Sequence, residues 1–117
     1  MAYSRVTPRA RQGTTGISVE QDITAGEGIW INPPDRVAAV TIAVHIPSGQ
    51  TASFTIETSC NLPETIGEDG TGGYWDNVYG DNVTLSENTT VMIANAVTGI
   101  RVNCTAASDK INVCFVG

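Results

Sequence analysis

Leucine and lysine are almost missing from this chain of 117 residues, since Leu occurs twice and Lys once. Both are strong helix formers, so their scarcity disfavours helices. In their place stand 15 Thr, 12 Val and 11 Ile residues. β-branched side chains lose rotamer freedom in a helix and pack well on a pleated sheet. We therefore expect an all-β protein, and the length is that of one domain.

Long apolar runs are also missing. Charged residues make up 15% of the chain and apolar residues 41%, which excludes both a disordered acidic tail and a hydrophobic membrane chain. The longest uncharged run, residues 37–56, is interrupted by His45, Pro47 and Gly49, so it cannot supply the roughly 20 apolar residues of a spanning helix. The first residues lack an apolar stretch and a cleavage site. We expect neither a membrane association nor a secretory signal.

Alternating apolar residues and turn signals recur from residue 16 onward, as in sandwiches and barrels. We predict eight strands, at 17–23, 28–32, 37–46, 51–59, 74–79, 83–86 joined to 89–94, 98–105 and 111–116. Two pairs that follow each other in the chain are predicted as hairpins: 37–46 with 51–59, and 98–105 with 111–116. The segment 32–35 contains two prolines and is predicted to form a corner between sheets. The expected fold is a two-sheet antiparallel β-sandwich, specifically a jelly roll of about eight strands.

Cysteine and histidine are scarce. Three cysteines, Cys60, Cys104 and Cys114, are an odd number in a chain for which we expect no export, so a disulfide framework is not implied. The predicted hairpin of the last two strands would place Cys104 and Cys114 on opposite faces, where they cannot be joined. We expect three free, mostly buried thiols. His45 is the single histidine and has no catalytic partner nearby in the sequence, and no zinc site or other cofactor is expected.

Residues 1–15 form a separate compositional unit, predicted as an extended basic N-terminal arm, with the sandwich domain at 16–117. Three of the six basic residues, Arg5, Arg9 and Arg11, lie in residues 1–11. The other 106 residues therefore hold three basic and twelve acidic groups, a net charge of −9. Nucleic acid binding is disfavoured, because an acidic body with three arginines on an arm makes a poor phosphate track.

One long irregular stretch, residues 61–73, is rich in glycine and acidic residues and is followed by aromatic residues. Loops of this length in small domains are commonly functional. A possible ligand loop here comprises Glu68, Asp69, Tyr74, Trp75 and Asp76. Aromatic faces beside carboxylates suit a carbohydrate. Oxygen ligands near glycines suit calcium, but the spacing is not that of an EF-hand, so we expect no metal requirement.

The C-terminal part of the chain resembles a family. Tyr74-Trp75, followed by NAVTGIRVNCTAASDKINVCFVG, is similar to small virion proteins of tailed bacteriophages, in which a Trp-containing strand precedes a PVTAIRV strand. Residues 96–102 fill that place, with Ala96 where the pattern has Pro. The segment VTIAVHIPSGQTASFTIETS is similar to the central strand pair of those proteins, so the resemblance covers residues 37–117. It implies a β-sandwich of the virion shell or tail, typically a trimeric head decoration or cement protein.

The resemblance implies a structural protein rather than an enzyme. Its expected partners are the major capsid protein and copies of itself in a homotrimer, and its expected place is the virion, assembled in the cytoplasm of the host bacterium. For the contact with the partner we predict residues of the arm, namely Tyr3, Arg5, Val6, Arg9 and Arg11. The alternative is a carbohydrate-binding module for host-surface or tail-associated adhesion that uses Tyr74, Trp75 and the acidic loop. A hydrolase is the third and least supported hypothesis.

Overall fold

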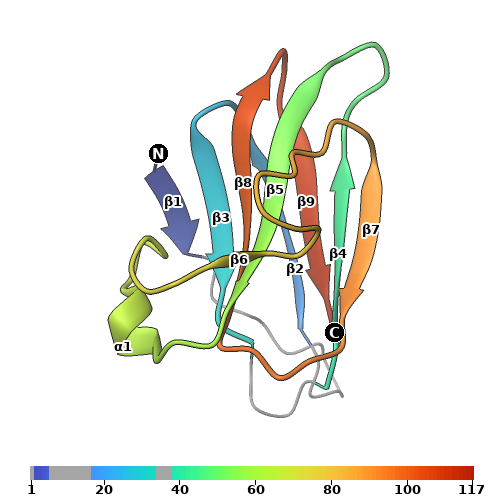
Figure 1. The fold of residues 1–117 in the computed structure, drawn as a ribbon. Helices are drawn as coiled ribbons and strands as arrows, with labels where there is room; N and C mark the ends of the chain where they lie inside the picture. Colours follow the sequence, from blue (N-terminus) through green and yellow to red (C-terminus); the bar gives the residue numbers. More distant parts are fainter. Residues whose placement is uncertain (1, 6–16, 34–37) are drawn as a thin grey trace.

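Two β-sheets packed face to face make up the molecule (Figure 1). The structure is a computed structural model, and it describes residues 2–5, 17–33 and 38–117. The predicted all-β sandwich is confirmed. One sheet has four strands, all antiparallel, in the order β2 (Ser18–Ile23), β9 (Ile111–Val116), β4 (Val40–His45) and β7 (Thr89–Ile93). The other has five strands, in the order β1 (Ala2–Arg5), β3 (Glu27–Ile31), β8 (Gly99–Ala107), β5 (Ala52–Ser59) and β6 (Asp76–Asn77).

The core lies between the sheets and is built by period-two alternation. In β4 and β9, every second residue is buried and the residues between them are partly or fully exposed. The five-stranded sheet contributes the facing layer through β3, β5 and β8. The residues of these five strands that form the core between the sheets are Ile29, Ile31, Val40, Ile42, Val44, Ala52, Phe54, Ile56, Ile100, Val102, Cys104, Ile111, Val113 and Phe115. Each strand therefore has one dry face and one face available for other contacts.

Both predicted hairpins are wrong. β4 and β5 follow each other along the chain, yet β4 pairs with β7 and β9 while β5 pairs with β6 and β8. In the same way β8 and β9 lie in opposite sheets. Each turn thus carries the chain across the sandwich. The alternation that we used as evidence for a hairpin shows only which face of a strand is buried, and that face is the same whether the next strand lies beside it or across the core.

The strand predicted at 74–79 is reduced to the two residues of β6. The strand predicted at 83–86 is a single bridge between Leu85 and Phe54. Between β5 and β6 the chain forms one helical turn, α1 (Pro63–Ile66), where we predicted irregular structure. Pro63 suits the first turn of a helix, because the N–H that proline lacks would be unpaired there in any case.

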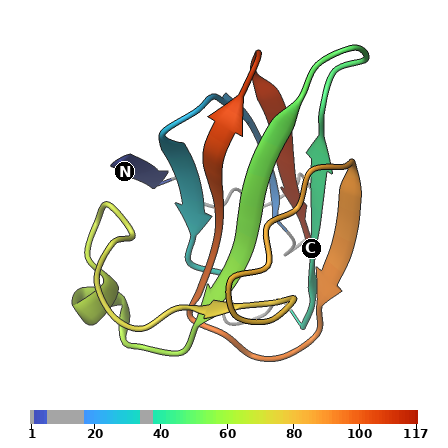
Figure 2. The same cartoon turned by 45° about the horizontal axis from the view of Figure 1, so that its top comes forward.

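The N-terminal strand β1 lies within the predicted arm. Its residues 2–5 pair in parallel with β3 of the same chain. Figures 1 and 2 show β1 at the edge of the five-stranded sheet, beside β3. The boundary predicted at residue 15 therefore does not separate β1 from the sandwich.

Candidate functional site

Trp30 marks the outer face of the five-stranded sheet. Its strand neighbours Ile29 and Ile31 belong to the core, so by alternation Trp30 points away from it. The side chain is nevertheless completely buried. It is covered by the loop that follows α1, because the indole N–H donates to the carbonyl oxygen of Glu68 at 3.0 Å. Figure 2 shows this segment beside the sheet, on the side away from the four-stranded sheet.

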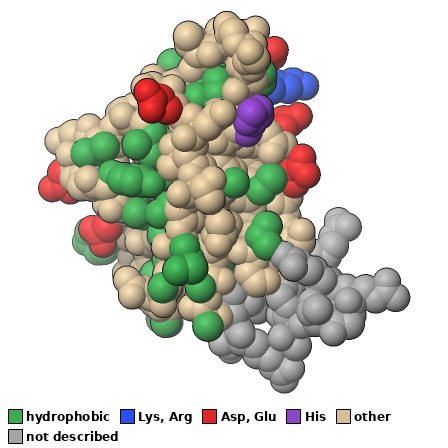
Figure 3. Space-filling model, turned by 90° about the vertical axis from the view of Figure 1, so that its right-hand side faces the viewer, with side chains coloured by type: hydrophobic (Ala, Val, Ile, Leu, Met, Phe, Trp, Pro, Cys, Tyr) green, Lys and Arg blue, Asp and Glu red, His purple; other side chains and the backbone are tan. Residues whose placement is uncertain are grey.

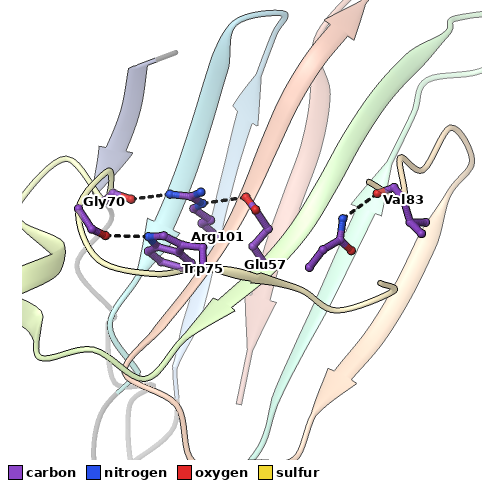
Figure 4. A network of polar contacts seen from close by, with 7 residues as sticks. Glu57, Gly70, Trp75, Val83 and Arg101 are labelled. Carbon is purple, nitrogen blue, oxygen red and sulfur yellow. Dashed lines mark hydrogen bonds and ion pairs between the residues drawn. The ribbon is translucent and has the colours of Figure 1, made fainter. Parts of the chain in front are cut away.

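Arg101 holds the same loop at a second point. It lies on β8 between Trp30 of β3 and Glu57 of β5. Its Nε forms an ion pair with Oε1 of Glu57 at 2.8 Å, and its Nη1 donates to the carbonyl oxygen of Gly70 at 2.9 Å (Figure 4). The two charged side chains are only 11% and 17% exposed. Because the pair is largely shielded from water, its hydrogen bonds are stronger than those of a surface pair.

Trp75 completes the arrangement. The guanidinium carbon of Arg101 lies 4.2 Å from the centre of the Trp75 ring, within the range of a cation–π contact. The ring also meets Trp30 edge-on, with 6.4 Å between the ring centres and 83° between the planes. Its indole N–H donates to the carbonyl oxygen of Gly72 at 2.9 Å. We call Trp30, Glu57, Trp75 and Arg101, with the loop backbone at Gly70 and Gly72, the tryptophan–arginine lock.

The lock changes the role of Trp75. A stacking platform for a sugar needs an open aromatic face and usually an available indole N–H. In Trp75 one face is covered by Arg101 and the N–H is already donated to Gly72. Tyr74, next to it, is 84% exposed, and Tyr79 is 41% exposed. An aromatic contact to a ligand at this site would therefore use the tyrosines rather than the tryptophan.

The acidic side chains of the predicted ligand loop either accept hydrogen bonds within the loop or face solvent. Oδ1 of Asp69 accepts the backbone N–H of Thr71 at 3.2 Å and its hydroxyl at 2.8 Å. These hydrogen bonds hold the pKa of Asp69 below its ordinary value, and the bond from the Thr71 hydroxyl contributes most. Glu68 contributes its carbonyl oxygen to Trp30, and Asp76 lies exposed on β6. Among the described residues there is no cluster of three or more His, Cys, Asp or Glu side chains suited to a metal ion.

The predicted partner residues are placed in part. Tyr3 pairs with Gly28 and Arg5 with Trp30 in the ladder between β1 and β3. Val6, Arg9 and Arg11 lie outside the described residues. The role of the arm in binding a partner stays a prediction.

The three cysteines are free, as expected, but not equally buried: Cys104 is buried, Cys114 is partly buried and Cys60 is exposed. The premise that Cys104 and Cys114 lie on adjacent strands is wrong, because β8 and β9 belong to different sheets. His45 is exposed on the outer face of the four-stranded sheet, opposite Asn112.

A polar cluster on the four-stranded sheet was not predicted. The side-chain amide of Asn112 donates to Glu20 at 2.8 Å and to Asp22 at 3.0 Å. The thiol of Cys114 donates to Oδ1 of Asn112 at 3.2 Å. Burial raises the pKa of the Cys114 thiol, and the charges of Glu20 and Asp22 raise it further. A thiol held in its protonated form is a poor nucleophile, so this cluster does not resemble a catalytic site.

A pocket of about 370 Å³ was also missed by sequence reasoning. It lies between the two sheets at one end of the sandwich, and its wall is mostly apolar or made of small side chains. The lining residues are Pro33, Ala38, Ala39, Val40, Cys60, Ile93, Asn95, Ala96, Val97, Thr98 and Ile100. The hydroxyl of Thr98 is already donated to carbonyl oxygens of Ser59 and Asn61. The Thr98 hydroxyl therefore serves the fold, and the other polar side chains of the lining are those of Cys60 and Asn95.

Comparison with known proteins identifies no relative, since no family model, no curated protein and no solved structure matches this chain. Within the described part of the chain, no helix has the length and apolar character needed to cross a membrane.

Proposed function

We propose that the protein is a structural subunit of a tailed-bacteriophage virion, a head decoration or cement protein that binds the major capsid protein and stabilises the shell, acting as a homotrimer without enzymatic activity. We further propose that its sandwich is a jelly roll. The strand orders are β2-β9-β4-β7 in one sheet and β3-β8-β5-β6 in the other. Between β2 and β9, the chain therefore crosses to the opposite sheet after every strand except β5, which is followed by β6 in the same sheet. Jelly rolls of this kind are used by viral capsid domains and by lectins.

The observation that carries the proposal is the tryptophan–arginine lock. The resemblance to phage virion proteins includes two segments that are separate in the sequence, Tyr74-Trp75 and residues 96–102. In the fold these segments meet, because Arg101 of the second lies over the Trp75 ring of the first. This contact supports the proposal, because it makes the two segments parts of one structural unit.

The charge distribution supports docking through the arm only in part. Three exposed ion pairs contribute roughly 0.2 to 1 kcal/mol each, so together they supply at most about 3 kcal/mol, which is weaker than millimolar binding. Apolar or backbone contacts, and the avidity of a trimer, must supply the rest. High salt should therefore weaken attachment without abolishing it, since salt screens exposed charges and leaves apolar contacts intact.

The test is cosedimentation with shells assembled from a tailed-bacteriophage major capsid protein, chosen from the genes that neighbour this one. We expect the full chain to sediment with the shells. The variant Arg5→Gln/Arg9→Gln/Arg11→Gln should bind more weakly, by roughly 3-fold to 150-fold, because three ion pairs are lost. Lys110→Gln, which removes a basic group in the exposed turn before β9, is the control and should bind as the unmodified chain does. A chain that never sediments with the shells would contradict the proposed function, whereas equal binding by the triple variant would contradict only the role of the arm.

Carbohydrate binding remains the second candidate, because the Tyr74 ring is 84% exposed beside the acidic loop. A glycan array separates the two functions. Specific binding that is lost in Tyr74→Ala, by a protein that does not sediment with shells, would favour an adhesion module. Shell binding that is unchanged in Tyr74→Ala, with no glycan signal, would favour decoration.

A further inference from the structure

The edges of the two sheets differ in how they are protected. Edge strands present unpaired N–H and C=O groups, and proteins usually shield them with charges, short length or a covering segment. In the five-stranded sheet, β6 has two residues, and the chain after it stays on β5 through hydrogen bonds at Val78 and Leu85. The opposite edge is the four-residue β1, whose sequence includes Arg5. In the four-stranded sheet, β2 carries Glu20 and Asp22 on its exposed face.

Among the described residues, β7 has none of these protections. Its sequence, TTVMI, contains no charge, no proline and no glycine. In the part of the chain that the structure describes, no strand pairs with β7 on the side away from β4. Met92 is 62% exposed on the outer face, and Val91 packs against the core while remaining partly exposed at the side of the sandwich. Figure 3 views the molecule from the side on which β7 lies in Figure 1, and the acidic side chains there lie around uncharged and hydrophobic ones.

We propose that β7 is a pairing edge and that its occupant is β7 of a second copy of this chain, arranged antiparallel about a twofold axis. The self-complementary register supports this occupant. A pair centred on Val91 places Val91 of each copy opposite the other on the inner face, and Thr90 opposite Met92 on the outer face. The charged residue nearest to β7, Glu87, then lies opposite Asn95 of the other copy, so no like charges meet.

The same operation at the middle of β2, the other edge strand of this sheet, is unfavourable. For β2, a twofold centred on Glu20 places Glu20 of the two copies opposite each other, and a twofold centred on Gln21 places Glu20 opposite Asp22. Like charges directly opposite each other destabilise a strand pair. With a net charge of −6 on each copy, association needs an uncharged surface, and β7 provides one. In the dimer, the four-stranded sheets of the two copies would join along β7 into one continuous sheet.

The experiment is sedimentation equilibrium of the full chain over a range of concentrations. One strand pair is a small interface, so for the free chain, without the shell on which the proposed homotrimer would assemble, we expect a weak dimer with a dissociation constant of about 0.1 mM and a limiting mass twice the chain's 12.3 kDa. In the proposed pair, position 90 of each copy faces position 92 of the other, so the variant Thr90→Lys/Met92→Lys creates two pairs of opposed ammonium groups. The dissociation constant of the dimer should rise by about tenfold or more. This variant also lowers the net negative charge, so a loss of association could not come from general repulsion.

Two further chains make the test specific. Thr90→Glu/Met92→Glu should also be monomeric alone, and mixing it with the Lys variant should restore a dimer, because each ammonium then faces a carboxylate. Ser18→Lys/Ser48→Lys, which adds the same charge at exposed positions outside β7, should dimerise at least as well as the unmodified chain. Circular dichroism and thermal melting confirm that each variant is folded. If one of the charged β7 variants does not fold, the other still tests the pair, because its like charges lie opposite each other in the same way.

Recovery of the dimer on mixing would support the β7 pair. A chain that stays monomeric up to about 1 mM would overturn it. So would a dimer or trimer whose mass is unchanged by both β7 variants, or a mass that grows without limit as copies join head to tail. None of these results decides whether the protein binds shells, which is measured separately.

Discussion

At Gly70 the loop backbone passes so close to the Trp30 side chain that there is no room for a Cβ atom. A Cβ at this position would lie 2.3 Å from Cδ1 of Trp30, and the backbone φ is +74°. Gly49, in the turn between β4 and β5, has nearly the same φ of +81° with nothing within 4 Å of its Cβ position. Substitutions at these two glycines can therefore be compared to separate the cost of backbone strain from the cost of steric contact.

We predict that Gly70→Ala is markedly more destabilising than Gly49→Ala. Both variants place a Cβ in the left-handed region, which costs about 1 to 2 kcal/mol. Gly70→Ala adds an overpacking cost of about 1 to 3 kcal/mol, because Trp30 is completely buried and must shift. Urea denaturation of the two variants measures the difference. Equal losses of unfolding free energy would show that the loop does not press on Trp30.

The cysteines differ in accessibility, and we predict that they react with a thiol reagent in a definite order. Cys60 is exposed and should be modified first. Cys114 is partly buried, and burial together with Glu20 and Asp22 raises its pKa, so it should react slowly. Cys104 is buried and burial also raises its pKa. It should react only after opening, about 100-fold slower or more if opening costs about 3 kcal/mol. Mass spectrometry of the peptides gives the order, and early modification of Cys104 would contradict this packing.

Among the elements, the segment from α1 to β6 stands apart because it adds no long strand to either sheet. It covers the outer face of the five-stranded sheet, and the tryptophan–arginine lock attaches it there. It is also held at Asn61, whose side-chain oxygen accepts the backbone N–H of Tyr74, and at Ile66, which is buried beside Gly99 of β8. The cover therefore lies on the outer face of the sheet, while the sandwich beneath it has its own core between the two sheets.

We predict that Trp75→Ala loosens this cover without unfolding the sandwich. The ring contacts Arg101 and Trp30 and donates to Gly72, so its loss should cost about 3 kcal/mol. In hydrogen exchange, the amides of Gly70 and Gly72 should lose protection while β8 and β9 keep theirs. Tyr74→Ala, at an exposed neighbouring position, is the matched control and should change little. Equal loss of protection in both sheets would mean that the cover and the core unfold together.

For the whole molecule, we predict that calcium does not stabilise the fold. Asp69 is already engaged by Thr71, and its carboxylate faces no cluster of further ligands in the described residues. Thermal melting with excess calcium should therefore match melting with chelator. Magnesium at equal ionic strength is the control for general salt effects. A calcium site filled about a thousand-fold above its dissociation constant would add roughly 4 kcal/mol and raise the melting temperature by several degrees, which would refute the prediction.

The strand content and the buried faces could be predicted from the sequence, because both are local properties. Scarce Leu and Lys with abundant Thr, Val and Ile indicated strands, and alternation in β4 and β9 identified the inner residues. The candidate site could be predicted only as a region. Trp75 and Asp69 were recognised as unusual, but their partners Arg101 and Thr71 were not. An arginine in the middle of an alternating strand was the one available signal.

The sequence by itself determined that this protein is a β-sandwich, since a face of β-branched residues must be covered whichever strand lies beside it. Only the tertiary structure decided the partners. β5 does not pair with β4, and β8 does not pair with β9. A short turn can lead either to a neighbouring strand of the same sheet or across the core, and the alternation of buried and exposed residues is the same in both cases. It also decided that Trp75 serves as part of a lock rather than as an open platform, because Arg101 reaches the ring only once β8 lies between β3 and β5.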